Sequence, residues 1–464
     1  MQRLPACPAA RVRRALAALL TLAGCAVSPP SPLPPAPGPR AEHPAPPRVA
    51  DARGVLAPAR AQQVLQRLER QGDSDVLARH LRATASLVQA PLRLGNRVEL
   101  LVDGPATLQA MFAAMRAARH TINLETYIID ATGTGRRLAD LLVSQRRKGV
   151  QVHLVYDGIG SIGTPPEYFE HLRQAGVAVC EYNPVNPLRA RGDWDLNNRD
   201  HRKILVVDGG TGFTGGINIS NTYSSSSFGR HRPGTPVQDG WRDTHVKVQG
   251  PAVLDLQRLF LQTWRSQCGE LPDDGMFPDV KPAGSKAVRV IAGVPGDSEV
   301  YAALLSAIER SEESVYITVG YFAPDPRTLL ALRNAAARGV DVRLALPGVS
   351  DFWAPLHAGR SHYDSLLAGG VRIYERRDAL LHAKTAVVDG VWSTIGSTNL
   401  DWRSFVHNDE ANVEVLDEGF GKQMQDLFWI DVDQSVEITA QAWHSRSAWE
   451  RMKEWFARQW EYLL

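Results

Sequence analysis

The chain has 464 residues, of which 44% are hydrophobic, so it is long enough to bury one or two large cores. Its 52 lysines and arginines nearly balance its 50 aspartates and glutamates. That balance argues against a dedicated nucleic-acid-binding protein, because such proteins usually carry a basic excess. We therefore expect no nucleic acid as a partner.

The first 25 residues have the features of an export signal. Arginines precede a short apolar stretch, residues 15–23, which cannot cross a membrane because a span needs about 20 residues. The stretch ends in Leu22-Ala23-Gly24-Cys25, which resembles the lipobox of bacterial lipoproteins. That resemblance implies lipidation of Cys25 and anchoring on the exported, periplasmic side of a bacterial membrane. The alternative is an ordinary secretory signal with an incidental cysteine.

Two cysteines remain in the body of the chain once Cys7 has left with the signal and Cys25 is modified. Cys180 and Cys268 could pair in an oxidising compartment. We favour two separate buried thiols, because the sequence cannot place the two residues together.

Composition divides the chain after residue 25 into further segments. Residues 26–57 form a tether rich in proline and alanine, which cannot build a core. Residues 58–95 follow as a helical segment with leucines at helical spacing. Two similar halves, 96–269 and 286–464, are separated by a linker at 270–285 that is rich in glycine and proline.

The two halves repeat one order of predicted elements. Helix, strand, helix, strand and helix are predicted at 107–119, 121–129, 136–148, 150–156 and 169–175, and again at 299–311, 314–322, 326–338, 340–346 and 362–368. We expect the second helix of each half to end at a glycine C-cap, Gly149 or Gly339. This alternation predicts an α/β fold of two lobes, each a mixed sheet flanked by helices and related by a pseudo-twofold axis.

One motif occurs in both halves with the same internal spacing. In the first half it comprises His201, Lys203, Asp208, Gly215, Gly216 and Asn218; in the second, His382, Lys384, Asp389, Gly396, Ser397 and Asn399. Each residue of the second set lies 181 positions after its counterpart, as 382 follows 201. Agreement at this many positions indicates a duplicated functional unit rather than chance.

The motif can assemble a phosphate site. A histidine and a lysine two residues apart on a strand point to the same face. An asparagine that follows a glycine-containing turn and a second strand can return to the same edge. Two such halves, face to face, place two histidines around one phosphate, with lysines and asparagines on its oxygens.

These groups suit a two-step transfer. One histidine attacks phosphorus and forms a phosphohistidine, while the other protonates the leaving alcohol and then deprotonates the incoming one. The lysines and asparagines stabilise the charge that develops on the phosphate oxygens. We expect no cofactor and no metal, since the sequence shows no cluster of metal ligands. The two histidines should titrate as a coupled pair.

Carboxylates that orient the histidines are expected beyond the motif. Asp243 and Glu410 occupy equivalent places in the repeat, where the offset falls to 167 residues, as 410 follows 243. We expect Asp208 and Asp389, at strand ends, to brace the motif structurally. The shorter offset leaves about 14 extra residues in the first half, which we assign to a loop at 223–234. Arg199 and Arg202 flank His201 and are expected either to attract anionic lipid or to be solvated charges.

The paired HxKxxxxD signature resembles the phospholipase D superfamily, and within it the bacterial cardiolipin synthases of the two-motif type. Further similar strings are Leu124-Glu125-Thr126-Tyr127 and Gly396-Ser397-Thr398-Asn399-Leu400-Asp401. The resemblance implies a metal-free ping-pong mechanism with His201 as nucleophile and His382 as general acid and base. It implies anionic phospholipids such as phosphatidylglycerol as substrates, a membrane surface as partner and no evident protein partner. The exported, anchored N-terminus and Gly216 in place of a serine depart from the pattern.

Several functions remain open at this point. Phosphatidyl transfer and phospholipid hydrolysis use the same catalytic residues, while a nucleic-acid phosphodiesterase and a silent lipid-binding lipoprotein are disfavoured. The C-terminus adds apolar residues at helical spacing: Trp449, Met452, Phe456, Trp460 and Leu463. We expect this helix to pack on the second half, as amphipathic helices usually face a core. The alternative is an interfacial helix that lies on lipid.

Overall fold

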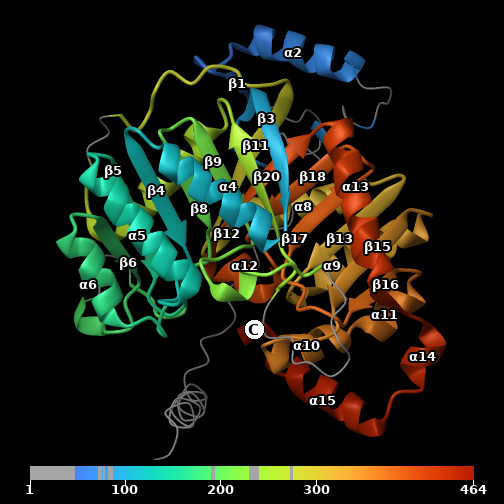
Figure 1. The fold of residues 1–464 in the computed structure, drawn as a ribbon. Helices are drawn as coiled ribbons and strands as arrows, with labels where there is room; N and C mark the ends of the chain where they lie inside the picture. The colour runs from blue at the N-terminus through green and yellow to red at the C-terminus, as the bar shows by residue number, and fades with distance from the viewer. Residues whose placement is uncertain are drawn as a thin grey trace, which may run out of the picture.

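The computed structural model describes residues 48–71, 76, 79–81, 87–189, 194–228, 240–271 and 275–464. The expected signal with Cys25, and the expected tether before residue 48, lie outside these residues. Within the described part of the chain, no helix has the length and apolar character needed to cross a membrane. Figure 1 shows two α/β lobes side by side, with their sheets in the middle of the molecule and helices outside.

The sheet of the first lobe is mixed. Its strand order is β6 (Ala178–Tyr182), β5 (Gln151–Asp157), β4 (Thr121–Thr126), β8 (Ile204–Val207), β9 (Thr211–Gly215), β10 (Thr244–Gln249) and β3 (Leu92–Val102). The pairings among β6, β5 and β4 are parallel and the others are antiparallel.

The second lobe repeats this order. Its strands are β16 (Arg372–Arg376), β15 (Asp341–Pro347), β13 (Ser314–Val319), β17 (Lys384–Val388), β18 (Trp392–Gly396), β20 (Asn408–Leu416) and β11 (Lys286–Val294). Strands β3 and β11 pair antiparallel at Asn96 and Lys286, so the two sheets are continuous. The predicted fold class, two repeated α/β lobes, is confirmed.

Helices cover the sheets. In the first lobe they are α4 (Gly104–Ala117), α5 (Gly133–Arg147), α6 (Pro166–Gln174) and α7 (Val253–Cys268). In the second they are α8 (Glu299–Glu309), α9 (Pro326–Ala337), α10 (Trp353–Arg360), α11 (Tyr363–Ala368), α12 (Trp402–Val406), α13 (Glu418–Asp433), α14 (Ala440–His444) and α15 (Ala448–Arg458). The predicted helices lie within a few residues of these bounds, but α7, α10, α12, α13 and α14 were not predicted.

Short elements complete the fold. They are α2 (Pro58–Gln71) and the strands β1 (Val49–Asp51), β2 (Gly54–Val55), β7 (Arg199–Asp200), β12 (Asp297–Ser298), β14 (Phe322–Ala323), β19 (Leu400–Asp401) and β21 (Ser435–Ile438). Strand β1 pairs parallel with β3, which attaches the N-terminal segment to the sheet.

Local sequence signals set the helix ends. Helix α9 starts at Pro326, and the Asp325 side chain caps it by accepting the backbone N–H groups of residues 327 and 328. Gly149 and Gly339 follow the last turns of α5 and α9 with φ of 92°, which confirms the predicted glycine C-caps.

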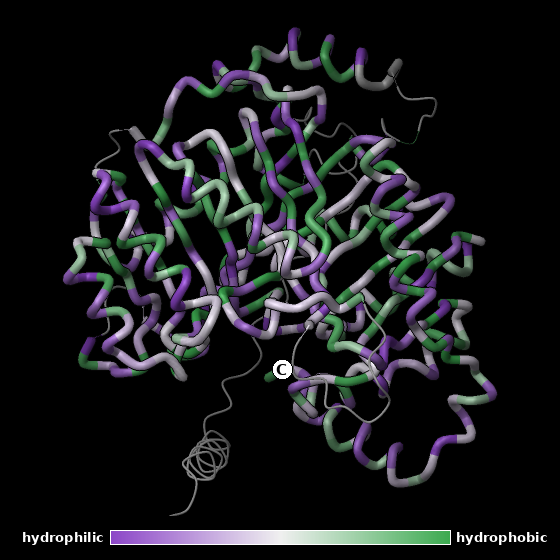
Figure 2. Tube along the Cα trace, in the orientation of Figure 1, coloured by the Kyte–Doolittle hydropathy of each residue, from purple (hydrophilic) through white to green (hydrophobic). Residues whose placement is uncertain are grey.

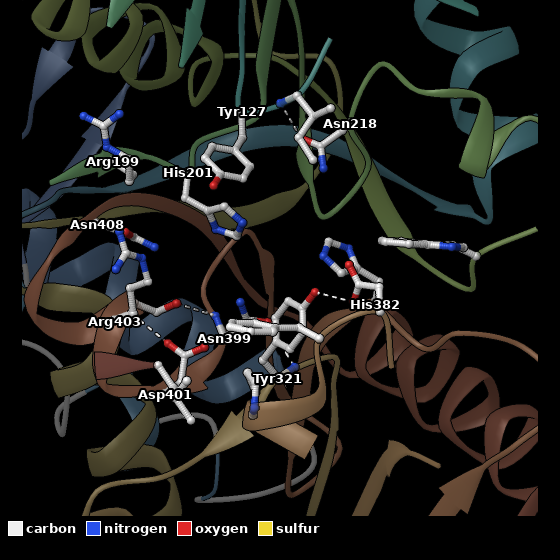
Figure 3. A pocket seen from close by; sticks show the side chains of 17 residues that line it. Tyr127, Arg199, His201, Asn218, Tyr321, His382, Asn399, Asp401, Arg403 and Asn408 are labelled. Carbon is white, nitrogen blue, oxygen red and sulfur yellow. Dashed lines mark hydrogen bonds between the residues drawn. The ribbon is translucent and has the colours of Figure 1, made fainter. Parts of the chain in front are cut away.

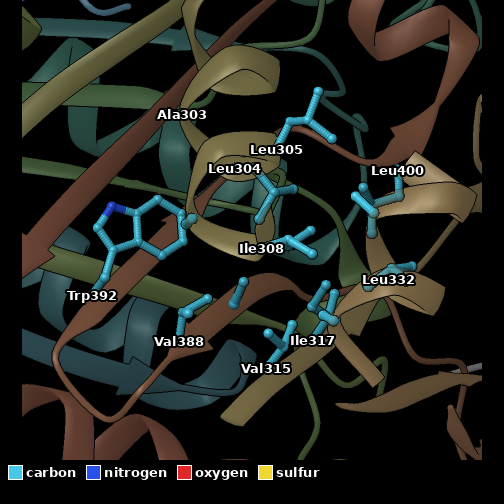
Figure 4. Packing of buried hydrophobic residues seen from close by; sticks show 14 of the residues in the cluster. Ala303, Leu304, Leu305, Ile308, Val315, Ile317, Leu332, Val388, Trp392 and Leu400 are labelled. Carbon is cyan, nitrogen blue, oxygen red and sulfur yellow. The ribbon is translucent and has the colours of Figure 1, made fainter. Parts of the chain in front are cut away.

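The largest apolar core lies in the second lobe. Figure 4 shows Leu304 and Ile308 of α8 packed towards Val388 of β17 and Trp392 of β18. Ala61 and Leu65 of α2 belong to the same cluster, so the N-terminal segment is part of this lobe. Figure 2 shows hydrophobic residues along the central strands and alternating hydrophilic and hydrophobic residues in α2.

Another apolar cluster joins the two lobes. It combines Val206 and Val246 of the first sheet with Val290, Ile395 and Val413 of the second. Because these buried side chains come from both halves, the relative position of the lobes is fixed by packing. The site between them is therefore held in one geometry.

Cys180 and Cys268 form a disulfide that joins β6 to the end of α7. Our expectation of two separate thiols is therefore wrong. The residues are 88 positions apart, and only the fold brings their Cα atoms to 5.9 Å.

Candidate active site

Each copy of the motif lies on one β-hairpin. Strands β8 and β9 form the first and β17 and β18 the second. Asp208 and Asp389 open the turns with φ of 50° and 51°, and each is followed by a glycine with positive φ, which is the backbone of a type I′ turn. The turn sends the chain back antiparallel, so Asn218 and Asn399 return to the end of the hairpin where the histidine begins it.

The two motif aspartates face away from the histidines. The Asp208 carboxylate accepts the backbone N–H groups of residues 119–121 at 2.7–2.9 Å. The Asp389 carboxylate accepts those of residues 312–314 and lies 3.0 Å from His80 Nε2. Each aspartate thus ties its hairpin tip to the start of the neighbouring strand. This geometry supports the bracing role expected for them.

The histidines are paired with carboxylates across the lobes. His201 Nδ1 lies 3.0 Å from Glu410 Oε1, and His382 Nδ1 lies 2.8 Å from Asp243 Oδ2. Asp243 and Glu410 were predicted as orienting carboxylates, but the crossed arrangement was not. A carboxylate at Nδ1 fixes the ring with Nε2 as its free nitrogen.

Lysines and asparagines complete each half. Lys203 Nζ donates to the His201 carbonyl at 2.6 Å, and Lys384 Nζ donates to the carbonyl of His382. Asn218 Oδ1 accepts the backbone N–H of Ile128 at 3.1 Å, and Asn399 Oδ1 accepts that of Tyr321 at 3.3 Å. Because the amide oxygen of each asparagine is occupied in this way, the NH₂ group is the part of each side chain that can donate to a ligand. These donors are suited to phosphate oxygens.

Both halves meet at one cavity of about 400 Å³. His201, Asn218, His382 and Asn399 line it together. Figure 3 shows the two imidazoles pointing into this space from opposite lobes. The sequence did not indicate its further lining, which includes Tyr127, Trp241, Tyr321 and Arg403. The rings of Tyr127 and Tyr321 meet His201 and His382 edge-on, with centroids 5.0 and 5.8 Å apart.

The arginines beside His201 are buried, so neither is a solvated charge. Arg202 is 1% exposed, and its guanidinium donates to Thr263 Oγ1 and to backbone carbonyls between the lobes. Arg199 also lines the cavity, but its guanidinium bonds to the carbonyl of Asn183 and contacts Asp157. Both expectations for Arg202 are wrong, since it is part of the interlobe core.

Tyr223 is a site residue that the sequence did not indicate. It belongs to the extra segment of the first half, residues 223–234, of which residues 229–234 lie outside the described residues. Its buried hydroxyl lies 3.1 Å from His382 Nδ1, and Asn218 Nδ2 donates to it at 3.4 Å. The insertion therefore links the asparagine of one half to the histidine of the other. A loop was predicted here, but nothing in its composition identified one tyrosine.

The two halves differ at Gly216 and Ser397. Ser397 Oγ donates to the Glu410 carboxylate and so holds the partner of His201. At Gly216 there is no room for a side chain, because a Cβ would lie 2.1 Å from Asp243 Oδ1. A hydroxyl at this position of the motif therefore holds the orienting carboxylate in only one of the two halves.

Burial and mutual repulsion shift the pKa values of this cluster. Burial, together with Lys203 and Lys384, lowers the pKa of His201 well below its ordinary value. Burial also lowers the pKa of His382, which Asp243 opposes through a hydrogen bond and its charge. The pKa of Lys203 falls to about 7 and that of Lys384 to about 8, chiefly through burial. An arriving phosphodiester anion would restore both ammonium charges.

Burial raises the pKa of Glu410 to about 7, which Lys203 and hydrogen bonds oppose. No group of three or more His, Cys, Asp or Glu residues suited to a metal ion occurs in the part of the chain that the structure describes. The site thus offers two oriented imidazoles and two amides that line one cavity, with a buried lysine two residues after each histidine. That set can carry out nucleophilic displacement at phosphorus with acid–base assistance.

Comparison with known proteins agrees with this geometry. The family model described as "Cardiolipin synthase, PLD-like domain" matches residues 111–228 and 304–432, one match in each lobe. Cardiolipin synthase A of Pseudomonas entomophila (strain L48) is 37% identical over 367 residues, which cover 78% of this chain and 74% of that protein. Cardiolipin synthase of Geobacillus kaustophilus (strain HTA426) is 38% identical over 343 residues, or 72% and 65%.

A solved structure shares the fold. Phosphatidylserine synthase of Haemophilus influenzae Rd KW20 superposes with a TM-score of 0.63 at 12% identity, covering 83% of this chain and all of that one. At this identity the likeness concerns the architecture alone.

Proposed function

Because the chain belongs to the phospholipase D superfamily and is a phosphatidyltransferase of the cardiolipin synthase type, we propose that it joins two phosphatidylglycerol molecules through a phosphohistidine on His201. The observation that carries this proposal is the crossed pairing of His201 with Glu410 and of His382 with Asp243 around one cavity. It gives one site two oriented imidazoles.

The first step forms the intermediate. His201 Nε2 attacks phosphorus, an N–P bond forms, and the bond from phosphorus to the head-group glycerol breaks. His382, as the imidazolium, gives its proton to the glycerol oxygen that leaves. Lys203, Lys384, Asn218 and Asn399 hold the non-bridging oxygens as their charge grows.

The second step reverses the roles. The terminal hydroxyl of a second phosphatidylglycerol gives its proton to neutral His382, its oxygen bonds to phosphorus, and the N–P bond breaks. The products of the two steps are one cardiolipin and one glycerol. Neither step consumes a further reactant.

The two histidines differ in a way that supports this division of labour. Burial and two lysines hold His201 in its neutral, nucleophilic form. Burial lowers the pKa of His382 as well, but the Asp243 carboxylate opposes that shift through a hydrogen bond and its charge, and so favours the imidazolium that the first step requires. The buried Tyr223 hydroxyl lies beside the same nitrogen and further fixes that ring.

We also propose that the enzyme is a lipoprotein anchored through Cys25 on the periplasmic side. The Cys180–Cys268 disulfide supports export, because such bonds persist in oxidising compartments such as the periplasm. In cell fractionation, Cys25→Ser should release the protein from membranes. Full retention of that variant would contradict anchoring through Cys25 alone.

Purified enzyme with phosphatidylglycerol vesicles in EDTA tests the reaction. We expect cardiolipin and glycerol in equal amounts, and a phosphatidyl adduct on the His201 peptide after an acid-free quench and mass spectrometry. His201→Ala and His382→Ala should each lose turnover by at least about 10³-fold. His171→Ala removes an exposed histidine of α6 and should keep full activity.

Three outcomes would contradict the proposal. Phosphatidic acid as the main product would assign a hydrolase instead. An adduct that persists in His201→Ala would place the nucleophile elsewhere. A requirement for a divalent ion would exclude the mechanism as written.

A further inference from the structure

The C-terminal helix exposes its apolar side. Trp449, Met452, Trp455 and Phe456 of α15 are 49–64% exposed. The helix does pack on the second lobe, but through Ala457, which clusters with Ala323 and Ala358. The helix therefore packs on the second lobe as predicted, but most of its apolar stripe does not make the contact.

A charged contact holds the helix in this orientation. Glu454 is 4% exposed, and its carboxylate accepts hydrogen bonds of 3.0–3.2 Å from Nε and Nη2 of Arg446. The Arg446 guanidinium in turn lies over the Trp443 ring at 4.1 Å. With the small and charged side fixed inward, the aromatic side must face outward. The exposure of the aromatic side chains therefore follows from the contacts of Ala457 and Glu454 with the second lobe.

Neighbouring elements extend this surface to the cavity. Phe352 and Trp353, at the start of α10, are 50% and 44% exposed, and the Trp353 ring lies 6.5 Å from that of Phe456. Trp460 and Leu463 continue it beyond α15. We call these residues the aromatic rim: Phe352, Trp353, Trp449, Met452, Trp455, Phe456, Trp460 and Leu463.

The rim borders the entrance to the active site. Phe352 lines the cavity that holds both histidines, and so does Leu464, the residue after Leu463. In Figure 1, α10, α15 and the C-terminus lie together at one edge of the molecule, below α12 and away from α2. An apolar surface of this extent next to a site marks an interaction surface.

We propose that the aromatic rim docks the enzyme on an anionic lipid bilayer with the cavity opening towards the head groups. This inference rests on the proposed function, since a phosphatidyl donor presents its phosphate at a membrane surface. Drawing acyl chains into water costs free energy in proportion to their apolar area, so docking lets the phosphate enter while the chains stay in the bilayer. Tryptophan suits the membrane interface, where one end of the ring is apolar and the other is wet.

The charges around the rim favour anionic lipid. Glu450 pairs with Lys453 at 2.6 Å and Glu461 with His362 at 2.7 Å, so the nearby carboxylates are occupied. Arg451 and Arg458 are exposed and form no ion pair within the described ranges. Two unpaired cations beside exposed tryptophans are complementary to phosphatidylglycerol head groups.

The proposed anchor is compatible with this orientation. Cys25 lies 24 residues before Val49, and a chain of that length reaches at most about 80 Å. A compact domain of this size is about 55 Å across. The anchor can therefore insert in the same bilayer that the rim contacts.

The test compares one enzyme on two forms of one substrate. In the first form, phosphatidylglycerol is part of a bilayer, in vesicles that contain equal parts of phosphatidylcholine. In the second form, short-chain phosphatidylglycerol is kept below its critical micelle concentration and is therefore monomeric. The variant Trp449→Ser/Trp455→Ser/Phe456→Ser changes only exposed side chains. We expect its kcat/KM to fall at least 10-fold on vesicles and to stay within twofold of wild type on the monomeric lipid.

A matched control removes exposed apolar residues elsewhere. Ile162→Ser/Leu188→Ser alters side chains of the first lobe that are 67% and 93% exposed, and it should behave as wild type on both substrates. Equal loss on both substrates, or no loss on vesicles, would overturn the proposal. Loss of a dimer in the triple variant, seen by light scattering in detergent, would assign the rim to a second copy. Absence of transfer by wild type on either substrate would instead refute the proposed function.

Discussion

Gly216→Ala should inactivate the enzyme by displacing the carboxylate that orients His382. The Cβ of the alanine would lie 2.1 Å from Asp243 Oδ1, whereas ordinary contact begins at 3.4 Å, so the two must separate by about 1.3 Å. Asp243 is fully buried, and the backbone N–H of Thr244 binds its Oδ1 at 2.7 Å. It cannot move without lengthening the 2.8 Å contact with His382 Nδ1.

A misplacement of about 1 Å near the reacting groups costs about 10²-fold in rate. We therefore expect kcat on phosphatidylglycerol vesicles to fall about 100-fold in Gly216→Ala. Overpacking of this kind destabilises a protein by about 1–3 kcal/mol, so the variant should still fold, which near-UV circular dichroism can verify. Gly163→Ala is the matched control, because a Cβ there meets nothing within 4 Å and its φ is not positive.

The same substitution in an Asp243→Ala variant shows whether the loss of kcat in Gly216→Ala is caused by displacement of Asp243. In Asp243→Ala the obstructing carboxylate is absent, so adding Gly216→Ala should change kcat by less than twofold. Wild-type activity in Gly216→Ala would refute the reasoning, as would a full 100-fold further loss in the Asp243→Ala background.

Three further predictions concern pH and stability. The profile of kcat/KM should be bell-shaped. On the acid side His201 must be neutral, and burial with Lys203 and Lys384 holds its pKa well below the ordinary 6.5. On the alkaline side His382 must be protonated, and Asp243 opposes the lowering of its pKa by burial. A flat profile to pH 10 would contradict the assignment. Cys180→Ser/Cys268→Ser should lower the free energy of unfolding by about 4–5 kcal/mol, which is the chain-entropy value for an 88-residue loop. Denaturant unfolding measures this difference, and an unchanged midpoint would exclude the contribution. Asp389→Ala should lower the free energy of unfolding by about 3 kcal/mol at pH 7, because three backbone N–H groups lose their acceptor. Hydrogen bonds hold the pKa of Asp389 below its ordinary value, so this contribution is present above pH 4 and is lost as the pH falls through the lowered pKa. Asp426 is exposed, and Asp426→Ala should show no such difference in unfolding free energy.

The duplicated motif made much of this fold predictable. Strand and helix signals recur in one order in both halves, and the structure repeats one strand order in both sheets. The same logic identified Asp243 and Glu410, since equivalent positions in a repeat occupy equivalent places. The repeat could not show which histidine each carboxylate meets. Those contacts join residues 139 and 209 positions apart, across the lobe boundary.

Features outside the repeat were harder to predict. Arg202 carries a charge beside the nucleophile, yet it is buried because β7 and β20 pair and bring Asp409 and Glu410 to its guanidinium. Tyr223 lies in an insertion that has no counterpart in the second half. Neither position follows from local pattern, because each depends on contacts between the lobes.

The crossed pairing explains why both halves must be intact. Within one lobe, His201 has its lysine and asparagine but not its carboxylate, which Glu410 supplies from the other lobe. The reverse holds for His382 and Asp243. A single lobe would therefore lack an oriented imidazole as well as the second histidine. The apolar cluster between the sheets holds each carboxylate on its histidine, so packing far from the cavity is part of what makes the two histidines reactive.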